Sequence, residues 1–336
     1  MKVAVIYNLE SQAVINHFGR PCQEQYSQET INDIKNSLAK GGHQVFAFEG
    51  DKHIIEKLEH FMTPAISGQI SGMVFNLCYG IQGKGRYMHI PGVLEMMGIP
   101  YVGSAPDTHA LAMNKVVTKI IIEKKGLPTP KFTVMERSDS DMRADMQYPL
   151  IVKPKDETSS LGLRKVTNEA QLRKGVKAIF DAFTTQTLVE EYIDGREINV
   201  GLLGNNPVVA LPPVELLFKE DPRIFTFEDK YNISGRKVDK ICPALLSKDE
   251  TVKIQQLAID TYNAVGCLDF ARVDIRLDKE GNPYVLEINS MPGLNRDSSL
   301  VIAAKNKGLD FTAFINRLVE VAHERYIDQV ITLSDD

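Results

Sequence analysis

Two strand-like runs near the C-terminal end, residues 268–277 and 283–289, constrain the fold of this chain more than any other feature. They flank a short polar segment, and a turn at Glu280-Gly281 suits that segment because glycine tolerates the positive φ of a tight turn. The pattern predicts a β-hairpin closed by a two-residue turn. This turn also sets the register, because each pair of facing residues follows from the pair nearest the turn.

The predicted register sorts the side chains of the hairpin onto two faces, because side chains alternate along a strand. On the polar face, Asp274 lies opposite Glu287 and Arg272 lies opposite Asn289. The apolar face carries Val273, Ile275, Leu286 and Ile288. Two facing carboxylates repel at a cost of up to about 1 kcal/mol, which a divalent cation between them would offset. Carboxylate and amide oxygens suit Mg²⁺ that is shared with phosphate oxygens. A solvated polar face is the alternative interpretation.

The overall charge argues against several classes of function. The 336 residues carry a formal net charge of -5 with a pI of about 5.9, whereas nucleic-acid and membrane-surface proteins need a basic face. No run approaches the roughly 18 apolar residues of a membrane helix. The scattered cysteines predict free thiols in a reducing cytoplasm: Cys22, Cys78, Cys242 and Cys267. We therefore expect a cytoplasmic protein without nucleic-acid or membrane partners.

Strand-like and helix-like segments divide the chain into three predicted domains of the α/β and α+β classes. Their alternation in residues 1–106 predicts a parallel sheet with helices on its faces. A helix at 108–125 opens a small α+β domain, residues 107–190. The third domain, residues 191–336, contains a polar loop at 218–240 and the hairpin.

An apolar strand that ends at Lys153 leads into a loop rich in small residues, including Ser159, Ser160 and Gly162. Such a loop lets backbone N–H groups surround phosphate oxygens, and the lysine supplies a positive charge beneath them. A second lysine, Lys115, lies within the predicted helix at 108–125. Taken singly, each lysine is also consistent with a surface residue, and the loop with an ordinary hairpin loop.

The strand predicted at 187–190 continues into a connector that ends at Asp194-Gly195, and Glu197 follows on the next strand. A connector between two domains is a favoured place for a ligand such as an adenine ring. A simple interdomain hinge explains the same pattern.

These pieces occur in an order that resembles the ATP-grasp superfamily, and closely its D-alanine–D-alanine ligase-like branch. The matching stretches span nearly the whole chain: 92–104, 113–115, 150–162, 189–193 with Glu197, 227–231, 241–244, 272–274, 286–289, 292–293 and 299–300. The resemblance implies a three-domain ATP-grasp fold with an N-terminal parallel-sheet domain. It also implies a ligase that uses ATP and Mg²⁺ to phosphorylate a donor oxygen, which is then joined to the amine of a small amino acid. A homodimer is expected from the same resemblance.

The resemblance assigns roles to individual residues. ATP phosphates would be held by Lys115, Lys153, Lys230, Ser159 and Ser160. Adenine and ribose would be lined by Glu190, Glu191, Ile193 and Glu197. Two Mg²⁺ ions, or Mn²⁺ in their place, would be bound by Asp274, Glu287 and Asn289. The catalytic set would comprise Arg272, the Gly293 N–H, Ser159 and Tyr231. The carboxylate of the acceptor amino acid would be anchored by Ser299 and Leu300.

The donor end departs from the pattern of this branch. The branch carries a Gly-rich turn after the first strand and then a Glu-Arg-x-Val-Ser stretch, whose glutamate binds the donor ammonium. Here the first strand continues into residues 7–12, which contain no such motif. Glu10 and Glu24 are the candidates to replace that glutamate, although the spacing supports neither.

The loop after the third strand differs as well. The branch has His-Gly where this chain has Tyr79-Gly80, and the following segment carries Lys84 and Arg86. We expect these four residues to form a rebuilt donor site for a larger or more acidic donor. One candidate activity is the addition of serine or threonine to mycosporine-glycine, which yields a mycosporine-like amino acid. A solvated loop is the alternative interpretation of Lys84 and Arg86.

Several functions compete with this hypothesis. An authentic D-alanine–D-alanine ligase of peptidoglycan synthesis would use the same ATP and acceptor sites. A non-catalytic nucleotide-binding regulator is favoured only where Arg272, Asp274 or Glu287 is lost, and all three are present. A dinucleotide-dependent oxidoreductase needs a G-x-G-x-x-G motif after the first strand, and this chain has none there.

Overall fold

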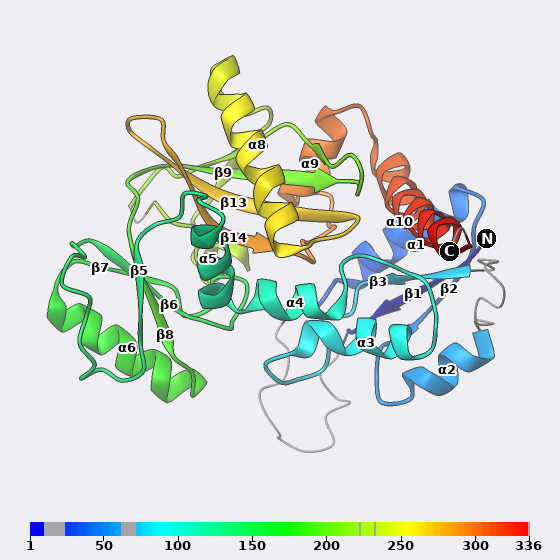
Figure 1. The fold of residues 1–336 in the computed structure, drawn as a ribbon, viewed down its shortest axis with the longest axis horizontal. Helices are drawn as coiled ribbons and strands as arrows, with labels where there is room; N and C mark the ends of the chain where they lie inside the picture. The colour runs from blue at the N-terminus through cyan, green and yellow to red at the C-terminus, as the bar shows by residue number, and fades with distance from the viewer. Residues whose placement is uncertain (10–23, 62–71, 222, 232, 335–336) are drawn as a thin grey trace.

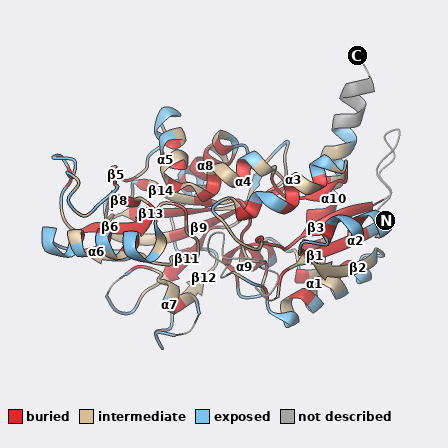
Figure 2. Ribbon diagram, turned by 90° about the horizontal axis from the view of Figure 1, so that it is seen from below, coloured by how far each residue is buried: buried red, intermediate tan, exposed pale blue. Residues whose placement is uncertain are grey.

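The computed structural model describes residues 1–9, 24–61, 72–221, 223–231 and 233–334. Three β-sheets follow one another along the longest axis of the molecule (Figure 1). The N-terminal sheet lies at one end, the small central-domain sheet at the other, and the sheet that contains the hairpin between them (Figure 1). Buried residues gather on the strands and on the helix faces that pack against them (Figure 2).

The N-terminal sheet is parallel, as the alternation of strands and helices predicts. Its strands stand in the order β2-β1-β3-β4, with bounds β1 Lys2–Tyr7, β2 Gln44–Glu49, β3 Gly72–Asn76 and β4 Tyr101–Val102. Parallel strands are usually buried on both faces. Val3 and Val5 of β1 pack with α1 (Gln28–Lys40). Ala4 and Ile6 pack with the helices of the other face, α2 (Ile54–Phe61) and α3 (His89–Met96).

The C-terminal helix α10 (Phe311–Ser334) packs against α1 and shares its core. A buried ion pair joins the same helix to the hairpin sheet: Arg325 donates to both carboxylate oxygens of Asp269, at 2.9 and 3.0 Å. Arg325 also donates to the Tyr101 carbonyl at 3.1 Å, and Asp269 accepts from the Gly103 N–H at 2.8 Å. Helix α10 therefore links the N-terminal sheet to the hairpin sheet.

The other two sheets are antiparallel. The central sheet has the order β5-β8-β6-β7 and is covered by α6, with bounds β5 Phe132–Met135, β6 Leu150–Pro154, β7 Arg164–Val166, β8 Thr187–Glu191 and α6 Glu169–Phe183. The hairpin sheet has the order β12-β11-β9-β13-β14, and β10 pairs with β9. Its bounds are β9 Gly195–Leu203, β10 Val209–Ala210, β11 Val214–Leu217, β12 Asp239–Ile241, β13 Phe270–Asp278 and β14 Pro283–Asn289, with α8 Lys248–Val265 packed on it. The predicted loop at 218–240 contains the short helix α7 (Phe227–Lys230) and ends in β12.

The turn of the hairpin differs from the prediction. The Asp278 N–H donates to the Asn282 carbonyl at 3.0 Å, so the loop contains three residues, 279–281, and not two. Gly281 closes it with φ at 81°, which explains why glycine stands there. Next to the turn, the pairing is therefore shifted by one residue from the predicted register.

A β-bulge then restores the predicted pairing at the other end of the hairpin. The register shifts between Asp274 and Ile275, and beyond this point Asp274 again lies opposite Glu287. Leu286 is the extra residue that the bulge accommodates. Its side chain lines a cavity on the polar face, contrary to its predicted place on the apolar face.

The predicted helix at 108–125 is broken at Asn114. The two helices are α4 (Pro106–Met113) and α5 (Lys115–Lys124). The Asn114 side chain accepts from the Val117 N–H at 3.3 Å and caps the second helix. Lys115 is therefore the first residue of a helix and not a mid-helix residue, which brings it to the edge of the cavity.

We propose domain boundaries at 1–106, 107–190 and 191–336, because each sheet falls within one of these segments apart from the last residue of β8. Helix α5 crosses this division, since Ile122 packs in the same core as Leu257 of α8. Across the described part of the chain, no helix combines the length and the apolar character that crossing a membrane requires.

Candidate active site

Most of the predicted site residues line one cavity of about 860 Å³, which lies where the three sheets meet. The residues brought together are Tyr79, Lys115, Lys153, Ser159, Ser160, Glu191, Ile193, Glu197, Lys230, Tyr231, Arg272, Asp274, Glu287, Asn289, Gly293 and Ser299. The predicted residues that do not line it are Gly80, Lys84, Arg86, Glu190 and Leu300. Tyr231 lies at the edge of the cavity and is 43% exposed.

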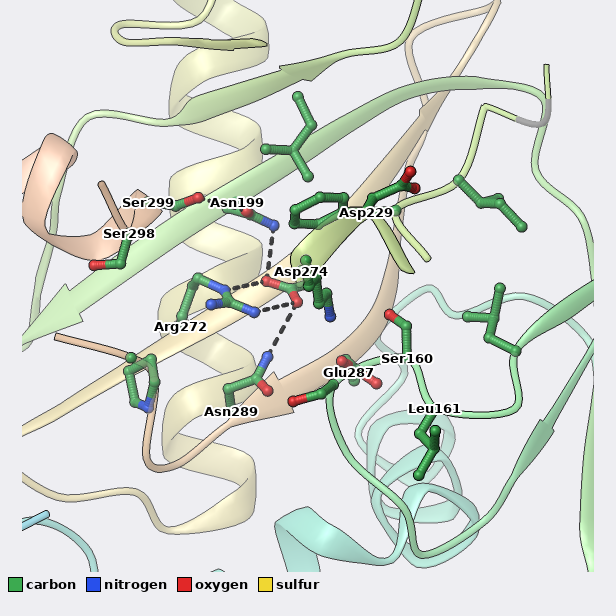
Figure 3. Close-up of a pocket in the computed structure, with 18 of the residues that line it drawn as sticks. Ser160, Leu161, Asn199, Asp229, Arg272, Asp274, Glu287, Asn289, Ser298 and Ser299 are labelled. Atoms are coloured by element: carbon green, nitrogen blue, oxygen red, sulfur yellow. Dashed lines mark hydrogen bonds and ion pairs between the residues drawn. The ribbon is translucent and has the colours of Figure 1, made fainter. Parts of the chain in front are cut away.

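Asp274 is the centre of a hydrogen-bond network on the polar face of the hairpin (Figure 3). Arg272 binds both of its carboxylate oxygens, at 2.6 and 2.8 Å. The Asn289 side-chain amide donates to it at 3.0 Å from the neighbouring strand β14. Asn199 donates at 2.8 Å from β9 on the other side, where it lies directly opposite Asp274. Asn199 was not predicted from the sequence, because no sequence pattern pairs β9 with β13.

Glu287 faces a group of cations. Lys115 lies 3.8 Å from its carboxylate, and the side chains of Lys153, Lys230 and Arg272 also act on it. Burial by itself would raise the pKa of Glu287, but the four cations lower it to about 2. The carboxylate is therefore ionised at neutral pH, as a metal ligand must be.

The donor set on this face fits a magnesium ion that is shared with a nucleotide. Asp274, Glu287 and Asn289 are oxygen-bearing side chains that line this face from neighbouring strands, and Arg272 donates to both Asp274 oxygens. Within the described ranges, no group of three His, Cys, Asp or Glu side chains is placed to hold a metal ion. A bound Mg²⁺ would therefore need oxygen ligands from outside the protein, which phosphate groups supply.

The loop after β6 is shaped by two residues in the left-handed region. Ser159 and Ser160 have φ of 54° and 59°, an uncommon conformation for residues with a Cβ. The loop is joined to the start of α5, because the Lys115 N–H donates to the Lys155 carbonyl at 2.9 Å and the Lys115 ammonium donates to the Glu157 carbonyl. The broken helix therefore places Lys115 directly beneath the serine-rich loop.

Glu190 lies behind the cavity and not in its wall. Its carboxylate is buried between Lys153, at 2.6 Å, and Lys119, at 2.9 Å. Lys119 lies one helical turn after Lys115 and also donates to Thr129, whose hydroxyl donates to the Val285 carbonyl of β14. This corrects the expected place of Glu190 beside the adenine: its side chain holds Lys153 in position. The buried position of Lys119 was not predicted, because a single lysine in a helix usually lies at the surface.

The cavity is lined by Glu191 at the end of β8, Ile193 in the connector and Glu197 near the start of β9. A buried arginine fixes the shape of the connector: Arg276 donates to the Ile193 carbonyl at 3.1 Å and to Glu197 at 3.2 Å. Arg276 stands two residues after Asp274 and therefore on the same face of β13. That period-two spacing was the signal by which the sequence could have revealed it.

Ser299 and Leu300 begin helix α9 (Ser299–Asn306), and they differ in position. The Ser299 hydroxyl donates to the Asn199 side-chain oxygen at 2.8 Å and lines the cavity near Asp274 (Figure 3). Leu300 is fully buried and packs against Gly201, where an added Cβ would approach Leu300 to 2.5 Å. Its side chain therefore serves the core, and only its backbone N–H belongs to the helix N-terminus at the cavity.

At the donor end, Glu24 occupies the cavity wall although its spacing in the sequence did not support this role. Its carboxylate accepts from the Tyr87 hydroxyl at 2.5 Å and from Ser159 at 2.9 Å. Tyr79 stacks on Tyr26, with ring centroids 5.3 Å apart and planes at 9°, and it also contacts Tyr87. Glu10, the other candidate, lies outside the described residues.

The loop after β3 does not form the expected basic donor site. The side chain of Lys84 is 71% exposed and lies 3.9 Å from Asp156. Arg86 is buried beside acidic side chains and does not line the cavity. Gly80 has φ of 88°, and a Cβ there would lie 2.2 Å from the Arg86 carbonyl, so its role is to let the chain turn. Of the four predicted donor residues, only Tyr79 reaches the cavity.

Comparisons with known proteins agree with this architecture. The family described as D-ala D-ala ligase C-terminus matches residues 121–320. An uncharacterised protein of Sinorhizobium fredii is 43% identical over 97% of this chain and 98% of its own. The D-alanine–D-alanine ligase of Pelotomaculum thermopropionicum is 31% identical over 91% of this chain and 95% of its own.

A solved structure of the D-alanine–D-alanine ligase from Bacillus anthracis, complexed with ATP, has the same fold. Its TM-score is 0.75 at 22% identity, and the match covers 98% of this chain and 99% of the other. The parallel N-terminal sheet, the two antiparallel sheets and the cavity between them are thus the ATP-grasp architecture. The chain belongs to the D-alanine–D-alanine ligase family.

Proposed function

We propose that this ATP-grasp ligase joins the carboxyl group of an amino-acid donor to the amine of a small amino acid, with release of ADP and phosphate. The observation that carries the proposal is the content of one cavity. It combines the hairpin carboxylates Asp274 and Glu287, of which Glu287 is ionised, with another carboxylate, Glu24, at the opposite end. The relatives named as D-alanine–D-alanine ligases, at 30–31% identity over most of this chain, support the same reaction class.

The donor end favours a substrate with a positively charged group. Two carboxylates, Glu24 and Glu157, line this end. Glu24 accepts from the hydroxyls of Tyr87 and Ser159, and one cation behind the wall, Arg86, lies within 3.7 Å of both carboxylates. An ammonium ion would find a charge-assisted partner there. Since Lys84 does not line the cavity and Arg86 is paired behind it, the charge at this end does not favour an acidic donor.

Activation of the donor requires a phosphoryl group beside the donor carboxylate. We assign the ATP phosphates to Lys115, Lys153, Lys230 and the loop that contains Ser159 and Ser160, and the adenine and ribose to Glu191, Ile193 and Glu197. A donor carboxylate oxygen attacks the terminal phosphorus, the bond to the bridging oxygen breaks, and ADP leaves. The product of this step is an acyl phosphate. Asp274, Glu287 and Asn289 would hold Mg²⁺, which neutralises phosphate charge as the group is transferred.

The second step forms the amide bond. The acceptor amine attacks the acyl carbon, phosphate leaves with the electrons of its C–O bond, and the amine loses a proton. The intermediate carries a negative oxygen, for which Arg272 and the Gly293 N–H are the donors that we assign. The acceptor carboxylate would lie at the N-terminus of α9, near Ser299, where the helix dipole favours an anion.

The more specific hypothesis of a mycosporine-like amino acid ligase depended on a basic donor site. The position of Lys84 and Arg86 removes that support, so we propose a simple amino acid as the donor. D-Alanine is the first substrate to test, because named relatives are D-alanine–D-alanine ligases. A role as a non-catalytic nucleotide-binding regulator would leave the donor carboxylate Glu24 without a function.

The test is ADP release in the presence of ATP and Mg²⁺ against a panel of D- and L-amino acids, each with and without mycosporine-glycine. We expect release with an amino acid alone and a dipeptide in the product mixture. Turnover only in the presence of mycosporine-glycine would overturn the amino-acid donor. Absence of ADP release under all conditions would overturn the proposed reaction. A homodimer remains our proposal from family resemblance, and light scattering tests it.

A further inference from the structure

Arg86 is a buried cation that belongs to the donor segment but contacts the phosphate loop. It begins the 3-10 helix Arg86–Met88 after β3 and is 6% exposed. One nitrogen of its guanidinium, Nη2, lies 3.1 Å from the Thr158 hydroxyl and 3.4 Å from the Glu157 carboxylate. The same nitrogen lies 3.7 Å from Glu24. Arg86 thus connects Glu24 with Glu157 and Thr158, which lie more than 130 positions further along the chain.

The partners of Arg86 form the wall of the cavity where its donor and phosphate ends meet. Glu24 and Glu157 both line the cavity, whereas Arg86 does not. Glu24 also accepts from Ser159, and the Glu157 carbonyl accepts from the ammonium of Lys115. A displacement of Arg86 would therefore reach the donor carboxylate and the phosphate-binding loop together.

The charges explain why this position needs an arginine. Two carboxylates, Glu24 and Glu157, lie within 3.7 Å of one guanidinium nitrogen. Without the cation between them they would repel in a largely buried environment. Removal of one partner from a buried ionic group is more harmful than loss of a surface pair, because the remaining charges stay desolvated.

We propose that Arg86 is a positioning residue that holds the phosphate loop, residues 155–163, against the donor carboxylate Glu24. The inference rests on the proposed function. It adds a coupling between the donor segment and the loop that binds the ATP phosphates. The loop is closed over the acyl phosphate only while the donor segment is in place. Loss of this contact admits water, which takes the acyl group in place of the amine and yields free donor and phosphate. ADP then forms without a matching amide bond.

The sharpest experiment measures ADP and amide product in parallel for the wild type, Arg86→Met, Arg86→Lys and Lys84→Met. Lys84 belongs to the same loop but is 71% exposed, so Lys84→Met is the matched control. We expect Arg86→Met to lower kcat/KM for the donor by about tenfold or more and to raise the ratio of ADP to amide above one. Arg86→Lys keeps the charge and should restore much of the coupling. Lys84→Met should behave as the wild type.

A substrate-independent measurement separates this proposal from the proposed function. Hydrogen exchange of the loop amides reports loop closure, including the Leu161 N–H, which donates to the Thr158 carbonyl, and the Leu163 N–H, which donates to the Ser160 carbonyl. We expect faster exchange at these two amides in Arg86→Met, with unchanged exchange in β13 and β14. Unchanged loop exchange, or an ADP to amide ratio of one in Arg86→Met, would overturn the positioning role. A wild type that makes no amide from any amino acid, but whose loop still depends on Arg86, would overturn the proposed function alone.

Discussion

At the hairpin end of the cavity the functional side chains stand on neighbouring strands, whereas at the donor end they come from separate segments. Arg272, Asp274, Glu287 and Asn289 share one face of β13 and β14. At the donor end, Glu24 precedes α1, Tyr87 follows β3, and Ser159 lies in the loop after β6. Backbone hydrogen bonds between neighbouring strands link the members of the first group, whereas side-chain hydrogen bonds link the members of the second. We therefore expect the hairpin end to hold the reacting groups rigidly. The donor end should determine which substrate binds.

The lysines show the same contrast between the two ends. Lys115 and Lys153 are buried in the cavity wall, each close to a carboxylate. Lys84 was the candidate for the donor end and is largely exposed. A charged side chain acts on a substrate only where the backbone places it in the cavity wall. The loop after β3 places Tyr79 there, and not Lys84.

The largest effect is expected for Glu287→Gln, which tests the hairpin end. It removes the ionised ligand that we assign to Mg²⁺, so ATP-dependent turnover should fall by more than about 100-fold. Circular dichroism should show an intact fold. Glu280→Gln, in the exposed turn of the same hairpin, is the matched control. Turnover close to the wild-type rate in Glu287→Gln would mean that the metal assignment is wrong.

Glu24→Gln tests the donor end and should have the next largest effect. Loss of a charged hydrogen-bond partner is expected to cost about 1.5–3 kcal/mol, and so to lower kcat/KM for the donor by roughly 10- to 100-fold. The KM for ATP should change much less. Steady-state kinetics with each substrate varied in turn measures the difference, with Glu29→Gln on the exposed side of α1 as the control. Equal losses for donor and ATP would remove the distinction between the two ends.

Ser299→Ala should give a smaller effect, confined to the acceptor. Removal of one neutral hydrogen bond costs about 1 kcal/mol, which corresponds to an increase of roughly fivefold in the KM for the acceptor. The backbone N–H groups of α9 remain in place. An equal increase in the KM for ATP would show that the hydroxyl acts through Asn199 on Asp274, with which it is connected in the structure.

The smallest effect at neutral pH is expected at His109, which joins the two ends. Its ring contacts Tyr87 of the donor end, and its Nδ1 lies 2.8 Å from the Ser290 hydroxyl next to β14. Burial lowers the pKa of His109 to about 4, from 6.5 in the unfolded chain. Between these two pH values the unfolded chain binds a proton that the folded chain does not. The free energy of unfolding should therefore fall with decreasing pH, by at most about 1.4 kcal/mol per pH unit from this group.

Urea unfolding between about pH 7 and pH 4.5 measures this contribution. His109→Gln should give a shallower decline of stability on the acid side than the wild type. The same substitution at exposed His60 is the control. Parallel declines in the wild type and His109→Gln would show that His109 does not titrate as its burial predicts.

The sequence was most informative where a regular period links residues to one face. The alternation in the hairpin placed Arg272 and Asp274 opposite Asn289 and Glu287, and the structure confirms both pairs. Two deviations from the predicted hairpin cancel in these pairs. The turn is one residue longer than predicted, which shifts the register by one residue, and a β-bulge reverses this shift. The bulge itself was not predicted, and for this reason the predicted place of Leu286 on the apolar face is wrong: its side chain lines the cavity.

Elsewhere, the positions of residues depended on contacts that no spacing encodes. Glu24 reaches the cavity only because the packing of α1 and the loop after β3 brings it to Ser159. Lys119 and Glu190 form a buried ion pair between a helix and a strand. Lys119 looks like a surface residue in the sequence, and the family resemblance placed Glu190 beside the adenine. The helices α9 and α10 were not predicted, although α10 completes the core of the N-terminal sheet.

Oxygen transfer from the donor to phosphate tests the central claim most directly. D-Alanine with ¹⁸O in its carboxyl group is supplied with ATP and Mg²⁺, and the released inorganic phosphate is analysed by mass spectrometry. If the donor carboxylate is phosphorylated in this cavity, one labelled oxygen should appear in phosphate for each amide bond formed. Amide formation with unlabelled phosphate would contradict the account, because the bond would then arise without an acyl phosphate.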